Sequence, residues 1–255
     1  MITKKTKEEI EILREGGKHL ATVLDKVRQI VKAGVNAKEL DTLAEKLIRE
    51  YGDTPAFLNY KPEGASYAYP ATLCVSVNSE VVHGIPLASK ILKEGDIVSI
   101  DLGLKHNGLY VDHAITVPVG EVSKKATELL KATREALSYG IDAAQLGKRV
   151  GDIGYAIEQF IKPRGYGIIR ELTGHGVGYE VHEDPYVPNY GKKGSGSKLE
   201  AGMVIAIEPM INEGSPAVFV ADDDWTYKTR DGKRSAHFEH TIVITEDGPE
   251  ILTQI

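Results

Sequence analysis

The sequence predicts a single α+β domain that spans residues 1–255 and is built from two similar halves. Two repeated passages and a repeated order of elements indicate this fold class. An apolar, strand-like passage that ends in an acid occurs at 95–101 and again at 202–208. A second passage, with an acid at its second position, occurs at 111–115 and again at 238–242. Each half also begins with two helical patterns, so we expect helix–helix–strand units related by pseudo-twofold symmetry.

The two helices of the first half are predicted from capping signals. Thr6 and Glu9 have the spacing of a capping box, and apolar residues at helical spacing follow until Gly34 ends the pattern. Asn36 and Glu39 mark a second helix start in the same way. The first half therefore opens with two consecutive helices.

The second half repeats this order. Helical patterns run from about Ser123 to Tyr139 and from about Gln145 to Ile161, and Pro163 ends the second one. The halves are therefore expected at about 1–120 and 121–255, with no independent linker between them.

One hairpin in the first half lets the geometry be predicted. Asn107-Gly108 favours a two-residue turn, because both central positions of a type I′ turn need a positive φ. Counting back from that turn pairs Gly103 with Asp112. Side chains alternate between the faces of a strand, so Asp101 shares the face of Gly103 and Asp112. Asp101 and Asp112 are therefore diagonal neighbours, while the opposite face is apolar and suits packing against helices.

The four acids of the repeated passages are expected to converge on one site. These acids are Asp101, Asp112, Glu208 and Glu239. Two carboxylates about 5 Å apart repel by roughly 3 kcal/mol at an effective dielectric constant of 20. A cluster of four must therefore take up protons or bind cations, and two divalent ions would balance the four formal charges. A single acid in a strand is usually only solvated, but four acids at duplicated positions favour a metal site.

Three histidines lie close to these passages in the sequence. His175 stands between glycines in the run 174–178, where the backbone can approach a ligand closely. The glycine spacing does not fit a dinucleotide-binding loop. His182 follows seven residues later, and His83 precedes the first acidic strand. Most isolated histidines are surface or hydrogen-bonded residues, but His175 lies in the half that otherwise supplies only two ligand candidates.

Composition limits the class of protein. The formal net charge of −6 argues against a general nucleic-acid binder, so we expect no specific nucleic-acid partner. The single cysteine, Cys74, excludes an internal disulfide framework and is consistent with a reducing compartment. No apolar run resembles a signal peptide or reaches transmembrane length, so the expected location is cytoplasmic, without a membrane partner.

The four acids and His175, with the motifs around them, resemble those of methionine aminopeptidases, and the resemblance extends over almost the whole chain. The matching motifs are His83-Gly84-Ile85-Pro86, Gly174-His175-Gly176-Val177-Gly178, His182-Glu183-Asp184-Pro185, Glu208-Pro209 and Glu239-His240-Thr241. Only 33 positions separate His175 from Glu208, which is similar to the compact type I enzymes of bacterial style. The resemblance implies the pita-bread (creatinase/aminopeptidase-like) fold, in which the duplicated units surround a central curved antiparallel sheet.

The resemblance also implies a binuclear metal site. Asp112 and Glu239 would bridge two divalent ions, of cobalt, manganese, iron or zinc, and Asp101 would complete the shell of one ion. His175 and Glu208 would complete the shell of the other. A water or hydroxide between the ions would then attack the scissile carbonyl.

Two kinds of residue would support this reaction. By resemblance, Glu208 would also shuttle the proton, His182 would stabilise the tetrahedral intermediate, and His83 would contact the scissile amide. The methionine side chain would bind in a pocket whose expected lining is Tyr69, Cys74, Val181, Trp225, Phe57 and Tyr60. Asn78 and Ser235 resemble positions of a monovalent-cation site that uses backbone oxygens.

The implied function is metal-dependent removal of the N-terminal methionine from nascent proteins and peptides, with a preference for a small second residue. The expected partners are N-termini of nascent polypeptides, with transient ribosome contact as a further option, and the protein is expected to be a monomer. Two alternatives remain open. A prolidase or Xaa-Pro aminopeptidase shares the fold and the ligands but usually has a larger N-terminal domain. A non-catalytic binding module on this scaffold would be expected to lack metal ligands.

Overall fold

Four helices make up the α-helical part of the computed structural model, which describes residues 2–255. They are α1 (Lys7–Gln29), α2 (Ala37–Glu50), α3 (Lys124–Ala143) and α4 (Val150–Ile161), followed by a short 3₁₀ helix (Lys162–Arg164). The capping boxes predicted at the starts of α1 and α2 are both present. These two boxes satisfy backbone N–H groups that would otherwise lack partners at the helix starts.

The central sheet has nine antiparallel strands. Its main order is β1-β4-β5-β14-β9-β7-β8, with β2 paired to β4 and β15 paired to β14. The strands are β1 (Thr54–Pro55), β2 (Leu73–Val77), β4 (Ile97–His106), β5 (Leu109–Pro118), β7 (Gly174–Gly176), β8 (Glu183–Val187), β9 (Val204–Ile207), β14 (Glu239–Thr245) and β15 (Gly248–Ile251). Two three-stranded sheets accompany it, made of β13 (Ser235–His237), β10 (Met210–Asn212) and β6 (Gly167–Ile168), and of β11 (Val218–Val220), β12 (Tyr227–Thr229) and β3 (Glu80–Val82).

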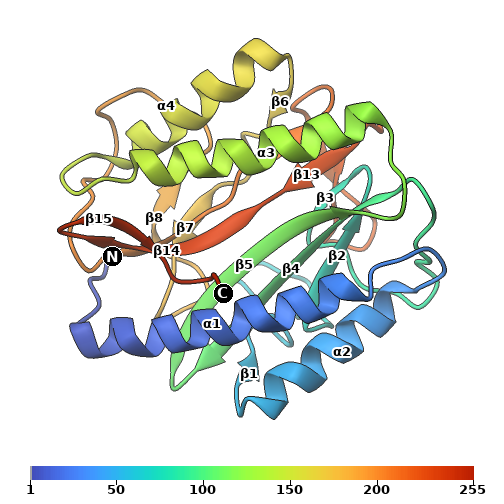
Figure 1. The fold of residues 1–255 in the computed structure, drawn as a ribbon, viewed down its shortest axis with the longest axis horizontal. Coiled ribbons are helices and arrows are strands. Elements are labelled where there is room, and N and C mark those ends of the chain that lie inside the picture. Colours follow the sequence, from blue (N-terminus) through green and yellow to red (C-terminus); the bar gives the residue numbers. More distant parts are fainter. Residues whose placement is uncertain (1) are drawn as a thin grey trace.

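The two halves of the chain meet along the pair β5–β14. In Figure 1, the helix pair α1/α2 lies below these central strands and the pair α3/α4 lies above them. One apolar core joins α1 and α2 to β2, β4 and β5, and a second joins α3 and α4 to β9 and β14. The helix–helix–strand repeat expected from the sequence is therefore present in the fold.

The predicted register of the first hairpin is confirmed. Gly103 pairs with Asp112, and Asp101 pairs with Ala114. The alternate residues, such as Ile100 and Leu102, point into the core under α1 and α2. The acids therefore occupy the face of the sheet that is turned away from these helices.

The second ladder is not an identical copy of the first. Ile100 pairs with Ile115 in the first half, and the corresponding residues of the second half are Ile207 and Ile242. Ile207 instead pairs with His240, a shift of two residues. An even shift leaves every side chain on its own face, so the repeated acids still point to the same side.

The predicted boundaries of the second helix pair were partly wrong. Helix α3 continues to Ala143, and α4 begins at Val150 rather than at Gln145. Gly147 has a φ of +80°, which lies outside the right-handed helical region, so a helix cannot run through this residue from Gln145. Arg149 is extended, and its backbone N–H donates to the carboxylate of Asp152 at 2.9 Å.

Candidate metal centre and substrate pocket

Most of the site residues predicted from the sequence line one cavity of about 160 Å³. It is lined by Phe57, Tyr60, Pro62, Tyr69, Cys74, His83, Asp101, Asp112, His175, His182, Glu208, Trp225 and Glu239. Val181 is buried in the same small apolar cluster as Tyr69 and Cys74. The structure thus brings the acids, the three histidines and the expected methionine pocket together.

Pairing of neighbouring strands places the four acids on one face. Ala114 of β5 pairs with Asp101 of β4 on one side and with Glu239 of β14 on the other. Asp112 lies two residues before Ala114, so its side chain points to the same face. Glu208 follows the last residue of β9, a strand that pairs with β14. Three strands therefore carry three of the acids, and the end of a fourth carries Glu208.

Burial and mutual repulsion favour the protonated forms of these acids. Desolvation raises the pKa of Asp112 to about 7 and that of Glu208 to about 8, and the charge of Glu208 adds to the effect on Asp112. Burial and the neighbouring carboxylates raise the pKa values of Asp101 and Glu239 well above their usual range. Protein groups alone therefore do not compensate the four charges.

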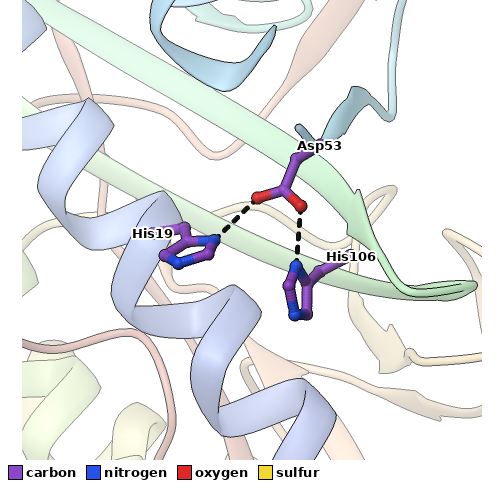
Figure 2. A group of neighbouring side chains, drawn as sticks. All are labelled: His19, Asp53 and His106. Atoms are coloured by element: carbon purple, nitrogen blue, oxygen red, sulfur yellow. Dashed lines mark hydrogen bonds and ion pairs between the residues drawn. The ribbon is translucent and has the colours of Figure 1, made fainter. Parts of the chain in front are cut away.

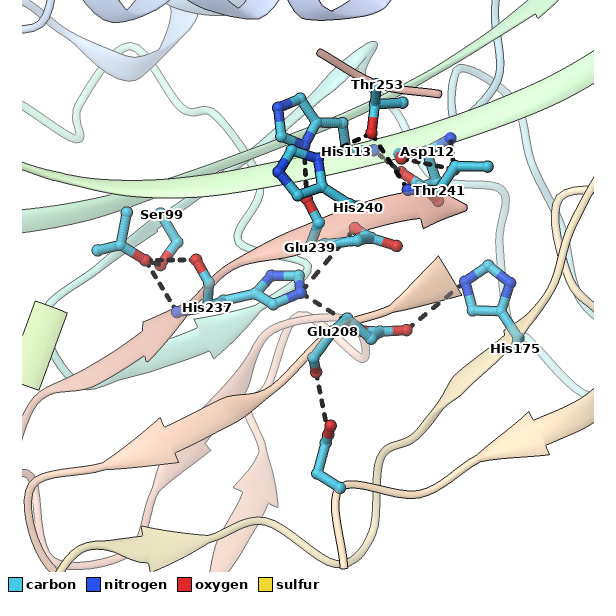
Figure 3. A network of polar contacts seen from close by, with 12 residues as sticks. Ser99, Asp112, His113, His175, Glu208, His237, Glu239, His240, Thr241 and Thr253 are labelled. Carbon is cyan, nitrogen blue, oxygen red and sulfur yellow. Dashed lines mark hydrogen bonds and ion pairs between the residues drawn. The ribbon is translucent and has the colours of Figure 1, made fainter. Parts of the chain in front are cut away.

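His175 is oriented as a metal ligand would be. Its Nδ1 lies 2.9 Å from the backbone oxygen of Gly176, so this nitrogen donates and Nε2 is left as an acceptor. Nε2 faces Oε1 of Glu208 at 3.5 Å (Figure 3). Burial lowers the pKa of His175 to about 3, which keeps the imidazole in the neutral form that binds metals.

The site fits a divalent cation. Asp112, His175 and Glu239 offer ligand atoms that all lie within 4.8 Å of one another. Among residues 2–255, Asp101 Oδ1 and Glu239 Oε1 are buried oxygens without a hydrogen-bond partner. Unpartnered buried carboxylate oxygens are costly unless a cation satisfies them. Carboxylates with one imidazole suit manganese, iron, cobalt or zinc.

His182 and His83 border the cavity beside the acids. The ring of His182 contacts His175 edge-on, with 4.4 Å between centroids, and its Nδ1 lies 2.8 Å from the hydroxyl of Tyr60. The ring of His83 contacts Trp225 edge-on at 6.3 Å. Desolvation lowers the pKa values of both histidines to about 4, and at His83 the nearby His182 adds to this effect.

The apolar part of the cavity has aromatic walls. Tyr69 and Trp225 meet edge-on with 5.2 Å between ring centroids, and Phe57 and Cys74 lie in the same apolar cluster. Tyr69 donates its hydroxyl hydrogen to a backbone oxygen, with Gly84 O at 3.1 Å. Its polar end is thus satisfied outside the cavity, and its ring is free to contact an apolar ligand.

Comparisons with known proteins agree with these motifs. Residues 11–246 match metallopeptidase family M24. The methionine aminopeptidase of Clostridium perfringens is 46% identical over 255 residues, and methionine aminopeptidase 1 of Bacillus subtilis is 45% identical over 255 residues, each covering 100% of both chains. The crystal structure of methionine aminopeptidase from Thermotoga maritima matches with a TM-score of 0.95 at 47% identity, covering 100% of both chains.

The chain belongs to the methionine aminopeptidases of metallopeptidase family M24. Its fold is the pita-bread fold that the resemblance implied, with a curved antiparallel sheet flanked by helices. The prolidase from Pyrococcus furiosus has the same fold with a TM-score of 0.75 at 27% identity, and the match covers 99% of this chain but 65% of that one. The methionine aminopeptidase match is therefore higher in identity and complete in length.

Sequence reasoning missed His237 beside the acids and Pro62 in the cavity lining. His237 is buried, and its Nε2 lies 3.3 Å from Oε2 of Glu208 and 4.0 Å from Oε2 of Glu239 (Figure 3). Burial lowers its pKa to about 3. Its position two residues before Glu239 was the available signal, because residues two apart in an extended segment point to one side.

Two other predicted residues lie together but outside the cavity. The backbone oxygen of Asn78 accepts the N–H of Ser235 at 2.8 Å, and the amide nitrogen of Asn78 donates to Asp96 at 2.7 Å. The monovalent-cation site expected there remains a prediction. Among residues 2–255, no helix combines the length and the apolar character that crossing a membrane requires.

Proposed function

We propose that this chain removes the N-terminal methionine from peptides and nascent proteins. The observation that supports this most strongly is one cavity in which four buried carboxylates and His175 adjoin an aromatic-lined apolar pocket. The pocket suits a flexible thioether side chain, since sulfur gains from contact with aromatic rings such as Tyr69 and Trp225. The names of the full-length relatives point to the same activity.

The metal ligands in this proposal are Asp101, Asp112, His175, Glu208 and Glu239. They would hold two divalent ions, with Asp112 and Glu239 shared between them. When bound, such ions polarise the scissile carbonyl and lower the pKa of the attacking water.

The protein's own groups would handle the proton and the developing charge. Glu208 is the proposed proton carrier, because a carboxylate that binds a metal through one oxygen can accept a proton from the attacking water at the other. The hydroxyl of Tyr60 can donate to Nδ1 of His182, which leaves the hydrogen of this imidazole on Nε2. Nε2 would then donate to the carbonyl oxygen as it becomes negative. His83 would contact the scissile amide.

A panel of four peptides tests the substrate assignment. We expect kcat/KM to be high for Met-Ala-Ser and much lower for Met-Lys-Ser, because His83 and the acids leave little room beside the scissile bond. Leu-Ala-Ser should be discriminated less strongly, since similar apolar side chains differ by only about 1–3 kcal/mol. A preference for Ala-Pro-Ser would instead favour an Xaa-Pro peptidase. Equal rates on the two methionine peptides would refute the crowding argument alone.

The cellular setting is part of the same proposal. We expect a cytoplasmic monomer that meets its substrates as N-termini of nascent chains, with transient contact to the ribosome as an additional partner. The physiological metal is proposed to be one of manganese, iron, cobalt or zinc. Asn78 and Ser235 are proposed to contribute backbone oxygens to a monovalent cation.

A further inference from the structure

A second group of potential metal ligands lies away from the cavity. His19 comes from α1, Asp53 from the segment after α2, and His106 from the end of β4 (Figure 2). Nδ1 of His19 lies 2.9 Å from Oδ2 of Asp53, and Nδ1 of His106 lies 2.7 Å from Oδ1. None of the three residues lines the substrate cavity. The repeat of acidic strands does not account for this group, because it has no counterpart at the repeated positions.

The three side chains are close enough to share one ion. Each offers a ligand atom, and these atoms all lie within 4.8 Å of one another. Tetrahedral zinc with bonds of about 2.0–2.1 Å needs its ligand atoms roughly 3.3 Å apart. The two nitrogen–oxygen distances are slightly shorter than this, so a small outward movement of the rings would admit an ion.

The surroundings hold the two rings in place. The ring of His19 stacks on Tyr51 with 4.1 Å between centroids. Gly16 lets α1 approach β4 closely, since a Cβ at this position would lie 2.8 Å from Cβ of His106. The side chains of Asp53 and His106 are only 3% and 9% exposed, whereas that of His19 is 19% exposed. Two ligands are thus fixed in the interior, and the third provides access from the surface.

The far nitrogen of His106 faces a further carboxylate. In the ion-free arrangement its Nε2 accepts a hydrogen bond from the amide nitrogen of Asn107 at 3.0 Å, and it also lies 3.4 Å from Oε2 of Glu15. A histidine that binds metal through one nitrogen usually donates its other N–H to a carboxylate or carbonyl. Glu15 can accept that hydrogen. Together with Asp53 it also supplies two negative charges, which a divalent ion would balance.

We propose that His19, Asp53 and His106 form a second metal site for one divalent ion such as Zn²⁺, with a water molecule as the fourth ligand. Without an ion, the two Nδ1–H groups donate to the two oxygens of Asp53, so the group is also satisfied as a set of hydrogen bonds. With an ion, each imidazole would carry its hydrogen on Nε2 and bind the ion through Nδ1, and at His106 this Nε2–H would donate to Glu15. The ion would link α1, the segment after α2 and the β4–β5 hairpin that carries Asp101 and Asp112.

Zinc stoichiometry tests this site without relying on activity. Chelator-treated protein is dialysed against buffered free Zn²⁺, and bound zinc is measured for wild type, His19→Gln, His175→Gln and the double variant. We expect wild type to bind one equivalent more than His19→Gln. The double variant should likewise bind one equivalent less than His175→Gln. Equal binding within both pairs would overturn the proposal and leave a hydrogen-bonded cluster.

Further measurements make the test independent of folding defects. His19→Gln should retain wild-type circular dichroism and wild-type kcat/KM on Met-Ala-Ser, because His19 does not contact the cavity. If that variant does not fold, wild-type crystals soaked in Zn²⁺ decide the question by anomalous scattering at the zinc edge. A peak within bonding distance of Nδ1 of both His19 and His106 supports the site, and peaks confined to the substrate cavity contradict it.

Glu15→Gln should weaken zinc binding at this site on the order of tenfold.

Discussion

Nζ of Lys5 lies 2.8 Å from Oε2 of Glu183, and the two side chains are only 1% and 6% exposed. The other oxygen of Glu183 accepts the backbone N–H of Glu180 at 3.1 Å. Glu183 directly follows His182 in the sequence. A single carboxylate therefore joins the N-terminal segment to the turn that presents a proposed catalytic histidine.

This ion pair predicts how stability depends on pH. Burial tends to raise the pKa of Glu183, but hydrogen bonds from Lys5 and Thr3 and the charge of Lys5 hold it below its usual value. Burial lowers the pKa of Lys5, although the hydrogen bond and the charge of Glu183 act in the opposite direction. The folded protein therefore stabilises the charged form of Glu183 but not that of Lys5. Between the folded and unfolded pKa values of Glu183, the unfolded chain binds more protons. The stabilisation is thus complete above about pH 4.5 and is lost as the pH falls.

Urea unfolding from pH 7 to pH 3.5 measures this effect. Glu183→Gln should lower the free energy of unfolding by about 3 kcal/mol at pH 7, because it leaves Lys5 buried without its charged partner. The difference from wild type should shrink as the pH falls toward 3.5. A difference that stays constant with pH would contradict the assignment.

His182 and His175 should respond differently to substitution. His182→Ala should lower kcat on the order of 10²- to 10³-fold with metal content retained, because its proposed role is to stabilise the transition state. His175→Ala should reduce metal content directly. Metal analysis and steady-state kinetics on the two purified variants make the comparison. If His182→Ala loses as much metal as His175→Ala, the division between stabiliser and ligand is wrong.

Gly103 should control the width of the methionine pocket. A Cβ at this position would lie 2.9 Å from Cε1 of Phe57, so Gly103→Ala must displace that ring. Overpacking of this kind costs about 1–3 kcal/mol of folding stability. A Phe57 ring displaced toward the pocket should also raise KM for Met-Ala-Ser, and about 1 kcal/mol of lost substrate binding corresponds to a roughly fivefold rise. In a Phe57→Ala background the same change should have a smaller effect, since the clash with the ring is gone. An unchanged KM in both backgrounds would show that Phe57 does not limit the pocket.

The parts of the fold that follow local rules were predictable from the sequence. Asn107-Gly108 set the turn, and the register and the shared face of Asp101 and Asp112 followed from it. The two-residue shift of the second ladder depends on contacts distant in the sequence, so alternation could predict the face of its acids but not its pairing. The start of α4 was missed because apolar spacing continues through Gly147, where the backbone leaves the helix.

The candidate site was predictable for residues that lie in repeated or distinctive motifs. The repeat identified all four acids, and the run 174–178 identified His175. His237 stands in no such motif, and its proximity to Glu208 depends on how β13 and β14 meet the end of β9. His19, Asp53 and His106 come from three separate parts of the chain, so only the folded protein brings this group together.

Recovery of activity after metal removal tests the central claim most directly. Protein is dialysed against a chelator, freed of it, and assayed for methionine release from Met-Ala-Ser while Mn²⁺ or Co²⁺ is added back. We predict no activity without metal, a fold that largely persists because both apolar cores are separate from the acids, and recovery of activity as metal is added. Full activity in rigorously metal-free protein would contradict the account.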